Sequence, residues 1–144
     1  MLRPLIAGGA CLWLLLPSPI SRSQAKALIE HDSTVAKPEP GPHNGGGQTT
    51  GYSFFAQAPN LTLVFRKRAL HRGAAIGYHR QEADEIYYVL SGRGTLTLNG
   101  AQSVVGRGTA ILTRAGSSHG LRQLGAEDLV IIVTYQQSGN VRRP

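Results

Sequence analysis

Between residues 61 and 133, apolar and polar positions follow a period of two rather than the longer period of an amphipathic helix. Leu61, Leu63 and Phe65 occupy alternate positions, which predicts a strand with one buried face. Other short runs of β-branched, aromatic or alternating residues recur along the chain, at 85–90, 95–98, 103–105, 110–113, 120–124 and 129–133. Seven or eight short strands at this spacing predict an all-β sandwich or barrel.

Turn residues separate these runs, and the alternation within each run predicts which side chains form the core. The dipeptide Asn99-Gly100 follows an alternating run and predicts a type I′ hairpin turn, because both central residues of that turn take positive φ. Alternation does not decide which of the adjacent residues Ile111 and Leu112 points inward. The predicted core is Leu63, Phe65, Ile86, Val89, Leu96, Leu98, Ile111, Leu112, Leu129 and Ile131.

The N-terminal segment differs from this pattern and predicts an export signal. Arg3 precedes the apolar run 5–16, which has twelve residues and is too short for the roughly 20 residues of a transmembrane helix. Ser23-Gln24-Ala25 is a small-x-small sequence at which a signal peptidase could cut. We expect residues 1–25 to be a signal peptide, so the mature protein is periplasmic or secreted, without stable membrane insertion. A retained membrane anchor and a lipid anchor on Cys11 are the alternatives.

The rest of the chain is predicted to contain an arm, one domain and a tail. Residues 26–51 include Pro-rich and Gly-rich stretches without apolar periodicity, which predict a flexible N-terminal arm. Residues 52–136 form the predicted β-barrel domain, and residues 137–144 form a C-terminal tail. The chain has 144 residues and a single cysteine, which precedes the predicted cleavage site. The mature chain therefore depends on its core rather than on a disulfide.

The net charge is positive, but its distribution does not indicate nucleic-acid binding. Lys and Arg number 15 against 8 Asp and Glu, giving a formal charge of +7. The basic residues are scattered, and the triplet 66–68 (Arg-Lys-Arg) is interpreted as a solvated strand face. Phosphate-binding loops, nucleophile elbows and dinucleotide-binding glycine motifs are absent from the sequence, which argues against kinases, serine hydrolases and dinucleotide enzymes.

Two segments carry the residues of a candidate metal site. His79 and Gln81 share one face of a strand, and Glu85 returns to that face if the residues between form a small bulge. His119 supplies a second imidazole from a distant strand. Two imidazoles, a carboxylate and an amide oxygen suit a divalent transition metal. Tyr87 has the parity of Glu85, so its hydroxyl could orient substrate or move a proton, or could simply pack in the barrel.

The same segments resemble the two sequence motifs of the cupin superfamily, and the chain looks like a small conserved-barrel member. The matching positions of the two motifs are Gly73, His79, Glu85 and Gly92, then Gly108, Gly116 and His119. Three positions depart from the pattern: Gln81 replaces a histidine, Arg114 a proline, and Gln123 an asparagine. The resemblance implies a single-domain jelly-roll β-barrel that holds Fe, Mn, Ni or Zn and that forms a homodimer. We expect dimerisation to use outer strands and the arm.

Two kinds of function fit these observations. One is a metal-dependent small-molecule enzyme of dioxygenase, isomerase or lyase type, with the metal in the barrel. The alternative is a non-catalytic protein that binds a sugar or another polar metabolite. The fold does not distinguish the two, because function depends on the site rather than the barrel. Bound metal with open coordination positions would favour the enzyme.

Overall fold

The structure is a computed structural model that describes residues 27–137. The predicted signal peptide, its cleavage site and most of the predicted tail lie outside the described residues. Within the described part of the chain, no helix is long and apolar enough to cross a membrane.

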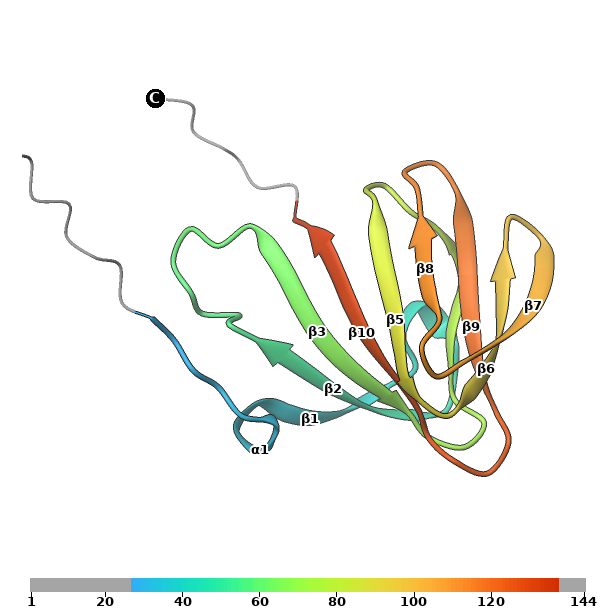
Figure 1. Ribbon diagram of the computed structural model, residues 1–144, viewed down its shortest axis with the longest axis horizontal. Coiled ribbons are helices and arrows are strands. Elements are labelled where there is room, and N and C mark those ends of the chain that lie inside the picture. The colour runs from blue at the N-terminus through green and yellow to red at the C-terminus, as the bar shows by residue number, and fades with distance from the viewer. Residues whose placement is uncertain (1–26, 138–144) are drawn as a thin grey trace, which may run out of the picture.

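Two antiparallel sheets pack face to face as a jelly-roll-like β-sandwich, which confirms the predicted all-β fold (Figure 1). The larger sheet has the order β1-β2-β3-β10-β5-β8, and the smaller has the order β4-β9-β6-β7. A one-turn helix, α1 (Asp32–Val35), and a short 3-10 turn, η1 (Pro42–Asn44), flank β1. The strands are β1 (Ala36–Pro40), β2 (Gln48–Phe54), β3 (Leu63–Leu70), β4 (Ala75–Arg80), β5 (Glu85–Ser91), β6 (Arg93–Leu98), β7 (Ala101–Gly106), β8 (Ala110–Thr113), β9 (Ser118–Leu124) and β10 (Leu129–Gln136).

The β6–β7 hairpin has the turn that the sequence predicts. Leu98 pairs with Ala101, so Asn99 and Gly100 form a two-residue connection. Asn99 has a φ of 48° and Gly100 a φ of 85°, both in the left-handed region that a type I′ turn requires. This hairpin forms one edge of the smaller sheet.

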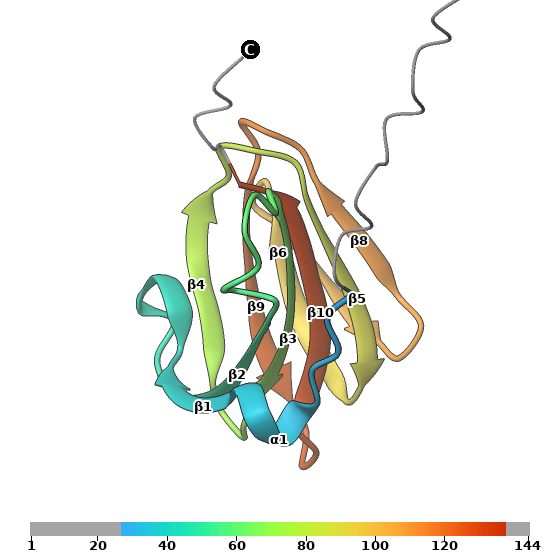
Figure 2. The same cartoon turned by 90° about the vertical axis from the view of Figure 1, so that its left-hand side faces the viewer.

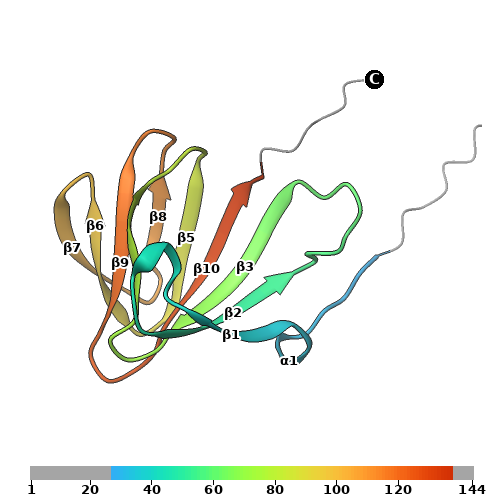
Figure 3. The same ribbon diagram turned by 180° about the vertical axis from the view of Figure 1, so that it is seen from behind.

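The segment predicted as a flexible arm is instead part of the sandwich. β1 pairs with β2, and β2 pairs with β3, so the larger sheet gains two strands from residues before 55 (Figures 2 and 3). The prediction failed because the prolines and glycines of this segment interrupt the alternation of apolar and polar residues that marks a strand. Long-range side-chain contacts hold these strands in place instead. Arg68, whose side chain is 11% exposed, donates to the Glu39 carboxylate at 2.7 Å and to the Thr49 hydroxyl at 2.7 Å, which fixes β1 and β2 against β3. The folded domain therefore begins before residue 52.

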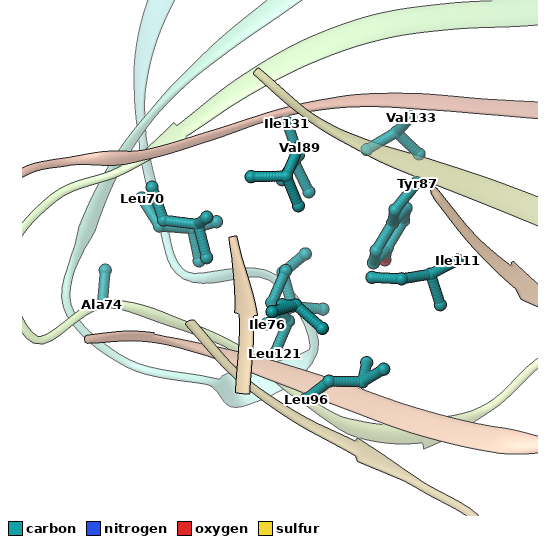
Figure 4. Packing of buried hydrophobic residues seen from close by; sticks show 12 residues of the cluster. Leu70, Ala74, Ile76, Tyr87, Val89, Leu96, Ile111, Leu121, Ile131 and Val133 are labelled. Carbon is teal, nitrogen blue, oxygen red and sulfur yellow. The ribbon is translucent and has the colours of Figure 1, made fainter. Parts of the chain in front are cut away.

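The core lies between the two sheets and contains about half of the predicted residues. Val89, Leu96, Ile111, Leu129 and Ile131 are buried, as predicted, and Leu98 is partly buried against them. Residues that the prediction omitted complete the cluster shown in Figure 4: Leu70, Ala74, Ile76, Tyr87, Val105, Leu121 and Val133. Ile111 rather than Leu112 points inward, which settles the alternative that the sequence left open.

Four predicted core residues lie on the outer face of the larger sheet instead. The exposed fractions of Leu63, Phe65, Ile86 and Leu112 are 45%, 39%, 44% and 51%. On β3 the inward positions are Arg66 and Arg68, which line a cavity, so the apolar residues point outward. Alternation gives the phase of a strand but does not say which face is inside. The interpretation of the basic triplet as a solvated face was therefore wrong for both arginines.

Candidate functional site

A cavity of about 450 Å³ opens at one end of the sandwich and brings together residues from both sheets and from the N-terminal segment. Its wall includes His79 of β4, Glu85 and Tyr87 of β5, and Arg66 and Arg68 of β3. Pro42 and His43 of η1, Arg80, Gln81, Val133 and Tyr135 complete much of the lining. Four of the predicted site residues, His79, Gln81, Glu85 and Tyr87, thus face a space large enough for a small molecule, whereas His119 lies behind this lining.

The two candidate imidazoles meet because β4 and β9 are neighbours. His79 and His119 are register partners on these antiparallel strands, after a β-bulge between Ile76 and His79. Their ring centroids are 4.8 Å apart and their planes are inclined at 70°. The bulge re-aims His79, since it changes the phase of β4 just before this residue.

Each imidazole is anchored through Nδ1, which leaves Nε2 directed toward the site. His79 Nδ1 lies 2.8 Å from the carbonyl oxygen of Gly77, which can only accept, so Nδ1 carries the proton. His119 Nδ1 lies 2.6 Å from the Thr113 hydroxyl, and both side chains are 1% exposed. Metal-binding histidines are commonly held in this way by a hydrogen bond at the other ring nitrogen. The imidazoles therefore fit the role of metal ligands.

Glu85 and Gln81 complete the group. The Glu85 Oε2 lies 3.3 Å from His119 Nε2, and the Gln81 amide nitrogen donates to the same carboxylate oxygen. The Gln81 amide nitrogen is also 3.4 Å from His119 Nε2. A cation between these groups would favour the opposite amide orientation, with the Gln81 oxygen facing it, which a rotation of the amide supplies. The structure thus brings together all four residues that the sequence singled out.

Three of the four donors, Gln81, Glu85 and His119, contact one another directly, and His79 is beside the His119 ring, so the donors do not surround a preformed metal position. Within residues 27–137, no group of three His, Cys, Asp or Glu side chains stands in a metal-binding arrangement. The chemistry of the set nevertheless suits a divalent transition metal, because it combines two neutral imidazole nitrogens with one buried carboxylate. Glu85 is 8% exposed, so a cation beside it would offset the cost of burying its charge.

Tyr87 lies beneath this group, within the core and at the cavity wall. Its ring is 3% exposed, and its hydroxyl oxygen is 3.3 Å from His119 Nε2. Burial, followed by the negative charge of Glu85, raises the pKa of the Tyr87 hydroxyl well above its ordinary value. The hydroxyl therefore stays protonated near neutral pH and can serve as a hydrogen-bond donor. It is not a base.

His43 and the cavity arginines are site residues that sequence reasoning missed. His43 lies in η1, and its ring stacks on His79 with centroids 3.4 Å apart and planes inclined at 7°. Partial burial, followed by the charge of His79, lowers the pKa of His43 below its ordinary value, so its imidazole is neutral near pH 7. No signal in residues 26–51 pointed to His43, because its placement depends on the pairing of β1 and β2. For Arg66, the sequence did contain a signal: Arg66 has the same strand parity as Arg68, so the two side chains lie on one face of β3.

Comparisons with known proteins agree with this fold. Residues 68–135 match the Cupin_2 family model, which describes a cupin domain. The chain is 34% identical over 71 residues to an oxalate-binding protein of Thermotoga maritima, covering 49% of this chain and 59% of that relative. The chain thus spans less than two thirds of the length of this relative.

Solved structures show the same architecture. A predicted oxalate decarboxylase of Thermotoga maritima has a TM-score of 0.70 and 24% identity, covering 76% of this chain and 99% of that chain. A cupin 2 conserved barrel domain protein from Rhodopseudomonas palustris has a TM-score of 0.63 and 16% identity, covering 73% and 72% of the two chains. At these identities the likeness shows the fold alone. Together with the family match over residues 68–135, this shared architecture identifies the described sandwich as a cupin domain.

Proposed function

We propose that the protein binds a divalent transition metal through His79, Glu85 and His119, with Gln81 as a weaker fourth ligand, and uses it to hold a small carboxylate. The observation that carries the proposal is the pairing of two imidazoles, each held at Nδ1: His79 lines the cavity, and His119 places its Nε2 3.3 Å from the buried carboxylate of Glu85. A bound metal would supply Lewis-acid activation of a carboxylate or carbonyl oxygen.

The cavity favours an anionic ligand because of its basic wall. Arg66 and Arg80 line the cavity, and within residues 27–137 neither makes an ion pair with a carboxylate. Arg68, by contrast, is paired with Glu39. Guanidinium groups bind carboxylates through strong, charge-assisted hydrogen bonds. The similarity to a protein described as oxalate-binding supports oxalate as the first carboxylate to test.

Oxalate is expected to bind the metal-loaded protein more tightly than the chelator-stripped protein, as measured by titration calorimetry. Substituting Arg66→Gln or Arg80→Gln should weaken oxalate binding by about tenfold, the effect of losing one charge-assisted hydrogen bond. Arg107→Gln is the matched control, since this exposed arginine lies away from the cavity and carries the same charge change. Equal oxalate affinity in all three variants would contradict an anionic subsite at this wall.

The choice between an enzyme and a binding protein can be tested with the same preparation. Protein purified without a metal-binding tag is first analysed for Fe, Mn, Ni and Zn. NMR of candidate carboxylates incubated with the metal-loaded protein then shows whether any is consumed. Consumption that stops in Tyr87→Phe would support a proton-donating role for Tyr87. Metal-free protein that still binds a sugar or another polar metabolite would favour the non-catalytic alternative.

Export remains part of the proposal. The positively charged start, the apolar run 5–16 and the sequence Ser23-Gln24-Ala25 support a signal peptide cleaved near Ala25. N-terminal sequencing of exported protein is expected to begin near Lys26. A start at Met1 would contradict it.

We also propose that two copies associate through the outer face of the larger sheet. Phe65, Thr134, Ile86 and Leu112 are successive register partners across β3, β10, β5 and β8, so they form one row. Three of the four are apolar and exposed, and none is charged. This row therefore brings no charged side chains together where two copies related by a two-fold axis meet along it. At the far side of this face, α1 is tied to β3 by an ion pair between Asp32 and Lys67.

Leu112→Lys is expected to convert this dimer to a monomer, because two copies would then bury unpaired ammonium groups. Light scattering at micromolar concentration measures the mass. Val104→Lys is the control, since Val104 is 64% exposed on β7 of the other sheet. A monomeric wild-type protein at that concentration, or a dimer that withstands Leu112→Lys, would contradict the proposed interface.

A further inference from the structure

We propose that His43 is a positioning residue for the metal site: its ring stacks on the His79 imidazole and fixes the direction in which His79 Nε2 points. This inference rests on the proposed metal-binding function. The ring centroids are 3.4 Å apart and the planes are nearly parallel at 7°, so the rings are in full face-to-face contact. The hydrogen bond from His79 Nδ1 to Gly77 holds one edge of the His79 ring, and His43 holds one face.

The backbone around η1 brings His43 into this contact. A Cβ atom at Gly77 would lie 1.9 Å from the His43 carbonyl oxygen, and one at Gly45 would lie 2.0 Å from the Ala75 carbonyl oxygen. Only glycine therefore allows the η1 segment to approach β4 so closely. His43 itself has a φ of 52° and a ψ of 40°, a left-handed conformation that is uncommon for residues other than glycine, although Phe55 also adopts a φ of 56° in this chain. The two close backbone approaches, at Gly77 and Gly45, and the left-handed backbone of His43 together place the His43 ring against His79.

The stacked geometry separates positioning from direct ligation. The lone pairs of imidazole nitrogens lie in the ring plane, so two parallel rings in face contact cannot both direct a lone pair at one ion. His119 is inclined at 70° to His79, an orientation that does allow a shared ion. Accurate placement of His79 matters more in this chain than in one with a third imidazole, since an amide oxygen at Gln81 is the weaker donor.

The test compares His43→Ala with His43→Phe in the full-length protein, titrated with Ni²⁺ after chelator treatment. His43→Ala is expected to weaken Ni²⁺ binding by about tenfold, the lower end of the range for residues that orient metal ligands. His43→Phe should stay within about threefold of wild type, because it keeps a flat ring but cannot coordinate. Gly45→Ala should behave like His43→Ala. Gly106→Ala is its control, since the nearest atom to its added Cβ is 3.5 Å away and it lies outside the site.

A second measurement does not require metal. In the metal-free protein, ¹⁵N chemical shifts of the His79 ring should show one tautomer with the proton on Nδ1, in wild type and in His43→Phe. His43→Ala should give a mixture of tautomers. Equal loss of Ni²⁺ binding in His43→Ala and His43→Phe would make His43 a ligand and overturn the proposal, as would an unchanged His43→Ala. If wild type binds no Ni²⁺, the metal function fails, and the His79 tautomer alone decides the role of the stack.

Discussion

His119→Ala is expected to abolish divalent metal binding near neutral pH, with no binding heat left in titration calorimetry of the chelator-stripped protein. His119 is 1% exposed, and its Nε2 faces the Glu85 carboxylate at 3.3 Å, so no other described side chain can take its place. Loss of one imidazole leaves too few donors to offset the dehydration of the ion. The same result is expected for His79→Ala and Glu85→Ala. Because a protonated imidazole cannot bind metal, wild-type affinity should also fall as the pH is lowered.

Gln81 provides the graded control for this prediction. Gln81→Ala should only weaken metal binding, since an amide oxygen is the poorest donor of the four. Gln81→His should strengthen binding of zinc, nickel or copper, because it supplies a third imidazole. Circular dichroism would verify that each variant retains its strands. A His119→Ala variant that binds metal as well as wild type would place the site elsewhere and would favour the metal-independent alternative.

Ile111→Ala is expected to lower the free energy of unfolding by about 2–5 kcal/mol, as measured by urea denaturation. Ile111 is 6% exposed and belongs to the core cluster between the sheets, where truncation removes apolar contacts and leaves a cavity. Leu129→Ala should cost a similar amount, since Leu129 has no exposed surface at all.

Leu112→Ala is the matched control for this second prediction. It removes a side chain of similar size from the adjacent position of the same short strand, but Leu112 is 51% exposed. A change within about 0.5 kcal/mol is expected for the monomeric domain, as for other surface substitutions. If the two substitutions destabilise equally under conditions where no dimer forms, the orientation of β8 described above is incorrect.

The sequence predicted the β-class, the Asn99-Gly100 turn and the meeting of His79, Gln81, Glu85 and His119. These features depend on local chemistry and on spacing within two short segments. The inward positions on β3 could not be predicted in the same way, because the face of Arg66 and Arg68 lines a cavity rather than the core. An inward-facing row of charged residues can be predicted from alternation only if the position of the cavity is already known.

The N-terminal strands illustrate a different limit. β1 and β2 are held by long-range contacts such as that between Arg68 and Glu39, which no local pattern reveals. His43 could not be assigned to the site for the same reason, since its ring reaches His79 only when β1 and β2 are paired. Tyr87 shows the reverse case: strand parity placed its side chain inward correctly, whereas its protonation state depends on burial and on Glu85.

The prolines of β1 also affect whether the larger sheets of two copies can join edge to edge. β1 is an edge strand of the larger sheet, and its sequence is Ala-Lys-Pro-Glu-Pro. Pro38 and Pro40 lack the amide hydrogen that an added strand would need. The barrel is therefore protected at this edge against strand addition and fibril growth. Strand-to-strand assembly along β1, which the predicted role of the arm would have used, is therefore disfavoured, and the broad side of the larger sheet is the face that we propose for association.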